Sequence, residues 1–102
     1  MKKDDLRDWT EVDRLIHEPA RLMILSILAA AEKVDFLFLL NETGLTKGNL
    51  SSHLGKLEGA GYIEIEKTYR GKVPQTLISL SETGRQAFEA YRKQLKNMMK
   101  YL

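Results

Sequence analysis

The hydrophobic positions in the middle of the chain repeat with the period of a helix. Three leucines follow one another at spacings of four and three residues, which places them on one stripe: Leu50, Leu54 and Leu57. Thr46 is a good N-cap, because its hydroxyl can accept a backbone N–H of the first turn. Gly61 stands where a left-handed residue would end the helix. We therefore predict a helix over residues 46–60.

The opposite face of this helix carries short or hydrogen-bonding side chains and little bulk. Its residues are Gly48, Asn49, Ser52, Gly55, Lys56 and Gly59. A helix with one apolar stripe and one small polar face can rest on a core and press closely against a polar partner. The major groove of DNA is such a partner, since it admits one helix and displays donors and acceptors on base edges. The alternative is an ordinary amphipathic helix that each glycine weakens by about 1 kcal/mol relative to alanine.

Three helices are predicted before this one. A mostly apolar stripe that includes Ile16 predicts a short helix over residues 4–17, and Pro19 then fits the first turn of a second helix. The second helix, through residue 31, is apolar nearly all round and should be the buried central helix. Asp35 can cap a third helix over residues 36–43, whose five consecutive apolar residues are too many for one inward face. A short buried strand is the competing assignment for these five residues.

After Gly61 the hydrophobic period changes from 3.6 to 2. Ile63 and Ile65 alternate with glutamates, as in a half-buried strand, and residues 75–80 read as a return strand. The intervening turn, residues 70–74, contains a glycine and a proline. The hairpin has a basic tip over residues 67–74, where Lys67, Arg70 and Lys72 surround Tyr69. The two helices before the hairpin are joined by a short turn at Gly44 and Leu45, which is the pattern of a helix-turn-helix. A solvated turn would explain the basic tip, but directly after a helix-turn-helix a contact with a phosphate backbone or a minor groove explains it better.

The last helix, over residues 82–101, begins after the capping residue Ser81 and carries a two-heptad apolar seam. The seam residues recur at spacings of three and four: Phe88, Tyr91, Leu95, Met98 and Leu102. We expect this seam, helped by Leu6 and Trp9, to hold a homodimer, with packing inside one chain as the alternative. Residues 1–18 hold four basic and six acidic side chains and residues 81–102 hold five basic and two acidic, so the two ends should attract each other.

Composition narrows the class of protein. The 102 residues suit one domain, residues 1–102, and a net charge of +2 is too small to indicate a nucleic-acid partner by itself. No cysteine is present and no apolar run approaches the roughly 20 residues that span a membrane, so we expect a cytoplasmic protein. The two histidines, His17 and His53, lie in different predicted helices and make no credible metal set. We expect no enzyme activity, no cofactor and no metal. His53 flanks the apolar stripe of its helix, and a histidine there more often packs or caps within the fold than binds a ligand.

The order of these elements is that of a winged-helix domain in the α+β class. Residues 45–57 and 60–63 resemble the recognition-helix signature of winged-helix transcriptional regulators of the ArsR/MarR-like group. Residues 70–76 resemble the wing of that group, residues 80–85 the start of its last helix, and residues 16–22 the start of its first core helix. The thiolate ligands of its metal-sensing members are missing here.

The resemblance implies a homodimer that binds a palindromic operator in double-stranded DNA. It also implies a set of DNA-contacting positions on the helix and the wing: Lys47, Gly48, Asn49, Ser51, Ser52, Lys56, Arg70 and Lys72. Asn49 and Ser52 would read base edges, and the basic residues would hold phosphates and the flanking groove. A different hypothesis is a winged-helix module that binds protein instead, through residues 36–40 and the last helix. The sequence identifies no small-molecule effector and leaves the role of residues 36–40 open.

Overall fold

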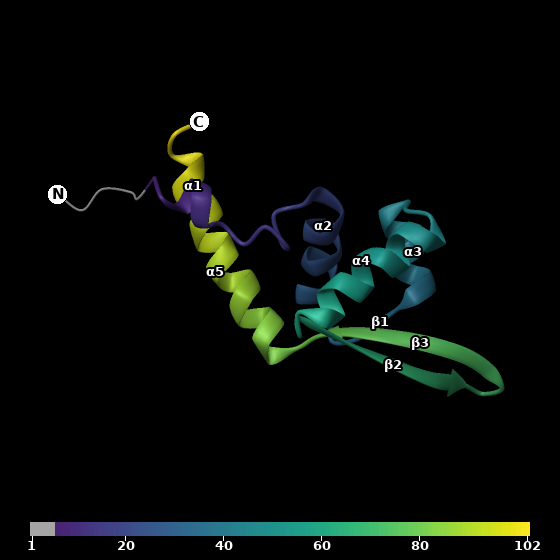
Figure 1. Ribbon diagram of the computed structural model, residues 1–102. Helices are drawn as coiled ribbons and strands as arrows, with labels where there is room; N and C mark the ends of the chain where they lie inside the picture. The colour runs from purple at the N-terminus through teal and green to yellow at the C-terminus, as the bar shows by residue number, and fades with distance from the viewer. Residues whose placement is uncertain (1–5) are drawn as a thin grey trace.

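The computed structural model describes residues 6–102 and shows a winged-helix fold (Figure 1). Its elements, in chain order, are α1 (Asp8–Glu11), α2 (Pro19–Ala29), β1 (Val34–Asp35), α3 (Phe36–Thr43), α4 (Lys47–Gly59), β2 (Ile63–Arg70), β3 (Val73–Leu80) and α5 (Glu82–Met99). The strands form one antiparallel sheet in the order β1-β3-β2. The three helices α2, α3 and α4 pack on one face of this sheet, and α5 leads away from it (Figure 1).

The prediction of a helix over residues 4–17 is wrong. Residues 4 and 5 lie outside the described residues, and α1 ends at Glu11 because Val12 is extended, with ψ at 143°. The carboxylate of Asp13 then accepts the backbone N–H groups of Leu15 at 3.0 Å and Ile16 at 3.2 Å, which closes a turn. An aspartate that binds the following backbone competes with helix formation, and here the turn is favoured.

The central helix and the helix after it match their predictions. Ile24, Leu25 and Leu28 of α2 are fully or almost fully buried. Residues 36–43 are helical, so the strand alternative is wrong, and only the two preceding residues join the sheet as β1. Leu39 is buried, whereas Leu37 and Phe38 are 58% and 50% exposed. The surplus of apolar residues on α3 therefore does lie at the surface.

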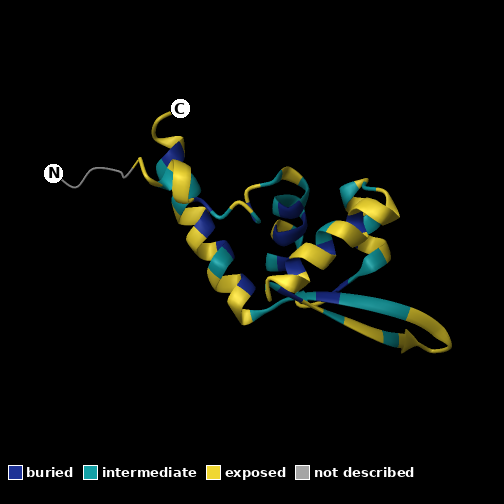
Figure 2. Cartoon of the chain, viewed as in Figure 1, coloured by how far each residue is buried: buried dark blue, intermediate teal, exposed yellow. Residues whose placement is uncertain are grey.

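Caps set the bounds of α4 as the sequence indicated. The hydroxyl of Thr46 accepts the backbone N–H of Asn49 at 3.1 Å, and Gly61 has φ at +79° just beyond the C-cap. The leucine stripe, Leu50, Leu54 and Leu57, faces the core with at most 3% exposure. In Figure 2 most of α4 is yellow, and the buried leucines interrupt the exposed segments at helical intervals.

The hairpin is longer, and its turn tighter, than predicted. Arg70 pairs with Val73, so the turn contains only Gly71 and Lys72, and Pro74 belongs to β3. Gly71 has φ at +65° and Lys72 does not have a positive φ, which matches a type II′ turn. Pro74 is tolerated in β3 because β1 pairs only with Leu77 and Ile78, further along the strand.

The long helix α5 starts at the predicted cap and runs beside α1. The hydroxyl of Ser81 accepts the backbone N–H of Gly84 at 2.9 Å. Near the other end, the amide of Asn97 donates to the carboxylate of Asp8 at 3.0 Å, so α1 and the end of α5 meet within one molecule. With principal extents of 61, 25 and 21 Å, the molecule is elongated, because this α1–α5 arm projects on one side and the hairpin on the other (Figure 1).

Candidate nucleic-acid interface

All eight positions expected to contact DNA are exposed in the structure. Six lie on or beside the exposed face of α4 and two at the hairpin tip: Lys47, Gly48, Asn49, Ser51, Ser52, Lys56, Arg70 and Lys72. The α4 face is rigid at its base, because the leucine stripe on its other side is part of the core. Helix α4 and the hairpin tip thus expose hydrogen-bonding groups, small residues and cations on a fixed scaffold.

Three glycines of α4 have no internal reason to be glycine. At Gly48, Gly55 and Gly59, a Cβ atom would meet nothing within 4 Å, and each φ is negative. Glycine inside a helix costs about 1 kcal/mol relative to alanine, and here no close contact within the chain explains that cost. The glycines do make the face flat, which lets a partner surface approach the helix backbone closely.

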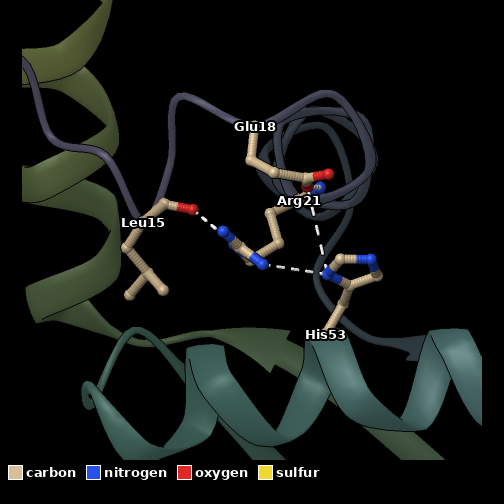
Figure 3. A network of polar contacts seen from close by, with 4 residues as sticks. All are labelled: Leu15, Glu18, Arg21 and His53. Carbon is tan, nitrogen blue, oxygen red and sulfur yellow. Dashed lines mark hydrogen bonds and ion pairs between the residues drawn. The ribbon is translucent and has the colours of Figure 1, made fainter.

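A buried arginine fixes how α4 sits on the rest of the domain (Figure 3). Arg21 of α2 is only 9% exposed; its Nε donates to the carbonyl oxygen of Leu15 at 2.5 Å and its Nη1 lies 3.0 Å from Nδ1 of His53 on α4. Arginine has no acceptor, so Nδ1 of His53 must accept, and the neutral ring carries its hydrogen on Nε2. His53 is therefore a structural partner of Arg21, as the sequence favoured.

Glu18 completes this network from the N-cap of α2. Its carboxylate accepts the backbone N–H of Arg21 at 2.8 Å and lies 3.9 Å from Nδ1 of His53. The backbone hydrogen bond from Arg21 is the main cause that lowers the pKa of the Glu18 carboxyl below its ordinary value, against the opposing effect of burial. The cap of α2 and the position of α4 thus share one cluster of polar groups.

The loop before α2 is also tied to the base of the hairpin and to α5. The hydroxyl of Tyr62 donates to the Asp13 carboxylate at 2.6 Å, and this hydrogen bond raises the pKa of Tyr62 to about 12. On the other side, Nδ1 of His17 lies 2.8 Å from the hydroxyl of Tyr91 on α5, and burial raises the pKa of Tyr91. These links connect the α1–α5 arm to the end of α4. Sequence reasoning missed them, because each joins residues far apart in the chain.

The two faces of the hairpin carry different residues. Side chains alternate along a strand, so Lys67 and Tyr69 of β2 share a face with the buried Ile63. Arg70 lies on the opposite face, together with Glu64 and Glu66, and Glu66 pairs with Lys33 at 2.9 Å. Of the wing cations, Lys67 therefore faces the side on which α4 packs, and Arg70 reaches out from the tip. The site residues predicted from sequence omit Lys67, although the alternation that begins at Ile63 indicates its face.

Residues 6–102 hold no group of three or more histidine, aspartate or glutamate side chains arranged to bind a metal ion. None of the helices formed by these residues is long and apolar enough to cross a membrane.

Comparison with known proteins agrees with this geometry. The family model described as a winged helix DNA-binding domain matches residues 20–99. The chain is 37% identical over 79 residues to an uncharacterised protein of Methanocaldococcus jannaschii, covering 76% of this chain and 85% of that one. The solved structure of a transcriptional regulator homologue from Pyrococcus horikoshii OT3 superimposes with a TM-score of 0.87 at 25% identity, over 93% of this chain and 96% of the other.

A more distant structure shares the fold. It is described as a candidate MarR-like transcription regulator from Bacillus cereus ATCC 10987 and aligns with a TM-score of 0.69 at 20% identity, covering 87% of this chain and 66% of that one. The family match spans all the elements from α2 to α5, including the exposed α4 face and the basic hairpin. On this evidence the protein belongs to the winged helix DNA-binding domain family.

Proposed function

We propose that this protein is a dimeric transcriptional regulator that binds a palindromic operator in double-stranded DNA. In this proposal α4 enters the major groove and the hairpin contacts the flanking backbone or minor groove. The observation that carries it is the exposed, glycine-rich polar face of α4 beside a hairpin with a basic tip, in a chain of a DNA-binding family. DNA as the partner also favours a cytoplasmic location, and no catalytic role is assigned.

The exposed residues divide by chemistry into base readers and backbone contacts. Asn49 and Ser52 can donate to and accept from base edges, so we assign them to sequence readout. Lys47 and Lys56 are exposed cations on the same helix and would hold phosphates. Gly48 and Ser51 would lie against the DNA backbone, while Arg70 and Lys72 at the wing tip would hold the flanking groove.

The test begins with a duplex selected by the protein from random-sequence DNA and measures its affinity by fluorescence anisotropy. Wild-type affinity should fall steeply with salt, with a log–log slope of about −0.9 for each phosphate contact. Arg70→Ala should weaken binding to all duplexes and flatten the slope. Asn49→Ala should instead reduce the preference for the selected duplex by about 1–3 kcal/mol per lost base contact and leave the slope unchanged. Absence of salt-sensitive binding at low salt and micromolar protein would refute the proposal.

The α1–α5 arm supports the dimer, although not through the whole seam expected from sequence. Phe88, Tyr91 and Met98 are at most 8% exposed within the single chain, so packing inside one molecule already covers them. Leu95 is partly buried. The apolar side chains that the arm leaves exposed lie on α1, just before it, and at the end of α5 and beyond it: Leu6, Trp9, Met99, Tyr101 and Leu102. A second copy would cover them.

Sedimentation velocity can test this interface without disturbing the core. Leu102 is 88% exposed and Met99 is 58% exposed, so changing both to glutamate should leave the fold intact and give monomers. Leu37→Glu is the matched control, because Leu37 is 58% exposed on α3. A Leu102/Met99 double variant that remains dimeric would exclude the arm as the interface, and a monomeric Leu37→Glu would place the interface on α3.

A second candidate function is a protein-binding module, favoured by the adjacent exposed Leu37 and Phe38 on α3. Such a module would have no DNA partner. The absorbance ratio at 260 and 280 nm of the purified protein distinguishes the two functions. A DNA-binding protein should carry nucleic acid that salt removes, whereas a protein-binding module should not.

A further inference from the structure

A groove runs between α4 and the hairpin, beside the residues assigned to base readout. It has a volume of about 600 Å³. Its walls are formed by α4 on one side, the strands β2 and β3 on the other and the start of α3 at the end. The lining residues are Phe36, Ser51, Leu54, Gly55, Glu58, Ile65, Lys67 and Thr76. Only Ser51 among them was assigned a role in the proposed function.

The groove combines an apolar floor with polar groups at its rim. Leu54 is almost fully buried, whereas Ser51 and Lys67 are exposed. Lys67 and Thr76 are cross-strand partners and both line the groove, so the sheet wall carries an ammonium group and a hydroxyl. The hydroxyl of Ser51 belongs to the helix wall. Donors on both walls, one of them positively charged, match an anionic oxygen-rich ligand that lies along the groove.

The placement of helix and hairpin on DNA identifies that ligand. In duplex DNA a sugar–phosphate strand separates the major groove from the neighbouring minor groove. If α4 lies in the major groove and the hairpin reaches the flanking groove, the strand between these two grooves must pass between α4 and the hairpin. We infer that this groove receives that strand, with Lys67 as its cation and the hydroxyls of Ser51 and Thr76 as neutral donors. The inference rests on the proposed function, gives the backbone contact of Ser51 its place, and adds contacts from Lys67 and Thr76.

Glu58 places a negative charge in the groove that is proposed to receive the phosphate strand. Its carboxylate lines the same groove as Lys67, and neither residue has an ion pair among the described contacts. A phosphate strand in the groove would therefore lie close to a negative charge, which opposes binding. Glu58 thus limits affinity, and its neutralisation should strengthen DNA binding. Glu64 is the matched control, because it is also exposed but lies on the opposite face of the sheet.

The first experiment compares Lys67→Ala with Lys93→Ala, an exposed lysine on α5, on the selected duplex. Lys67→Ala should lower affinity about tenfold and reduce the log–log salt slope by about 0.9 for each subunit bound. Lys93→Ala should change neither quantity. A double-mutant cycle between Ser51→Ala and Lys67→Ala should show coupling, whereas the cycle between Ser51→Ala and Arg70→Ala should be additive.

The second experiment measures Glu58→Gln and Glu64→Gln at low and moderate salt. Glu58→Gln should raise affinity severalfold, and Glu64→Gln should leave it unchanged. The inference is overturned if Lys67 and Glu58 variants behave like their controls while Asn49→Ala and Arg70→Ala still weaken binding. The inference is also overturned if native mass spectrometry finds a small molecule bound to the purified wild-type protein but not to the Lys67→Ala variant. Absence of salt-sensitive binding by the wild type would instead refute the proposed function itself.

Discussion

Replacing Gly55 with alanine should stabilise the protein and at the same time weaken its binding to DNA. Gly55 lies in the interior of α4, is exposed, and a Cβ there would meet nothing within 4 Å. Alanine therefore gains the full difference in helix propensity, about 1 kcal/mol, with no clash to offset it. For a domain near 100 residues, this gain corresponds to a rise in Tm of about 4–8 °C.

The effect on binding has the opposite sign, because the added methyl group stands on the face that we assign to DNA. A flat glycine surface lets the backbone of the helix approach the duplex, and a Cβ at that contact acts as overpacking, which costs about 1–3 kcal/mol. The affinity for the selected duplex should thus fall about five- to 150-fold. Thermal unfolding by circular dichroism measures the first effect, and fluorescence anisotropy measures the second.

Ser26→Ala is the control for this experiment. Ser26 is exposed on α2, away from the α4 face, so the substitution should improve helix propensity and leave DNA binding unchanged. A Gly55→Ala variant that is more stable and binds as tightly as the wild type would show that this face does not press against DNA. A variant that is no more stable than the wild type would contradict the reading of open space around Gly55.

Three further predictions concern stability. Gly84→Ala should destabilise by about 1–3 kcal/mol in chemical denaturation, because its Cβ would stand 1.9 Å from the carbonyl oxygen of Tyr62. Tyr62→Phe should cost about 1–2 kcal/mol by losing the bond to Asp13. Because the folded pKa of Tyr62 is raised to about 12, this contribution is present below pH 10 and should be lost as the pH rises towards 12 in a pH titration of stability. Glu18→Gln should weaken the cap of α2 by about 1 kcal/mol at neutral pH. The folded pKa of Glu18 is lowered, so the wild type should lose this contribution as the pH falls below the ordinary value of 4.5, and the variant should lack that dependence.

Local signals in the sequence were sufficient for most of the fold. Thr46, Ser81 and Gly61 act through hydrogen bonds or backbone angles within a few residues of themselves, so their caps and helix ends could be predicted without a partner segment. The change of period after Gly61 likewise identified the hairpin. The exposure of the eight DNA-contacting positions also followed from periodicity, because each lies off the apolar stripe or at a turn.

The predictions that failed are those in which a local pattern competed with distant contacts. Asp13 lies inside the helix predicted over residues 4–17, but its carboxylate instead closes a turn and accepts the hydroxyl of Tyr62, 49 residues away. The strand β3 begins at Val73 and includes Pro74, because cross-strand pairing outweighs the turn preference of proline there. Neither outcome can be read from neighbouring residues alone.

Periodicity shows which side chains are apolar but not what covers them. Phe88, Tyr91 and Met98 have the spacing of a coiled-coil seam, but a helix that packs on its own chain has the same spacing. These three of the five predicted seam residues are in fact buried within the single chain. Arg21 contacts His53 only because α2 and α4 pack side by side. Lys67 lies in one groove with residues of α4 only because α4 packs on that face of the sheet. The sequence by itself determined most of the helices and strands, their caps and their polar faces, because these depend on short-range interactions. The tertiary structure decided which apolar faces are buried within one chain and which remain open to a partner. Burial depends on segments that are distant along the chain, so neighbouring residues alone do not reveal it.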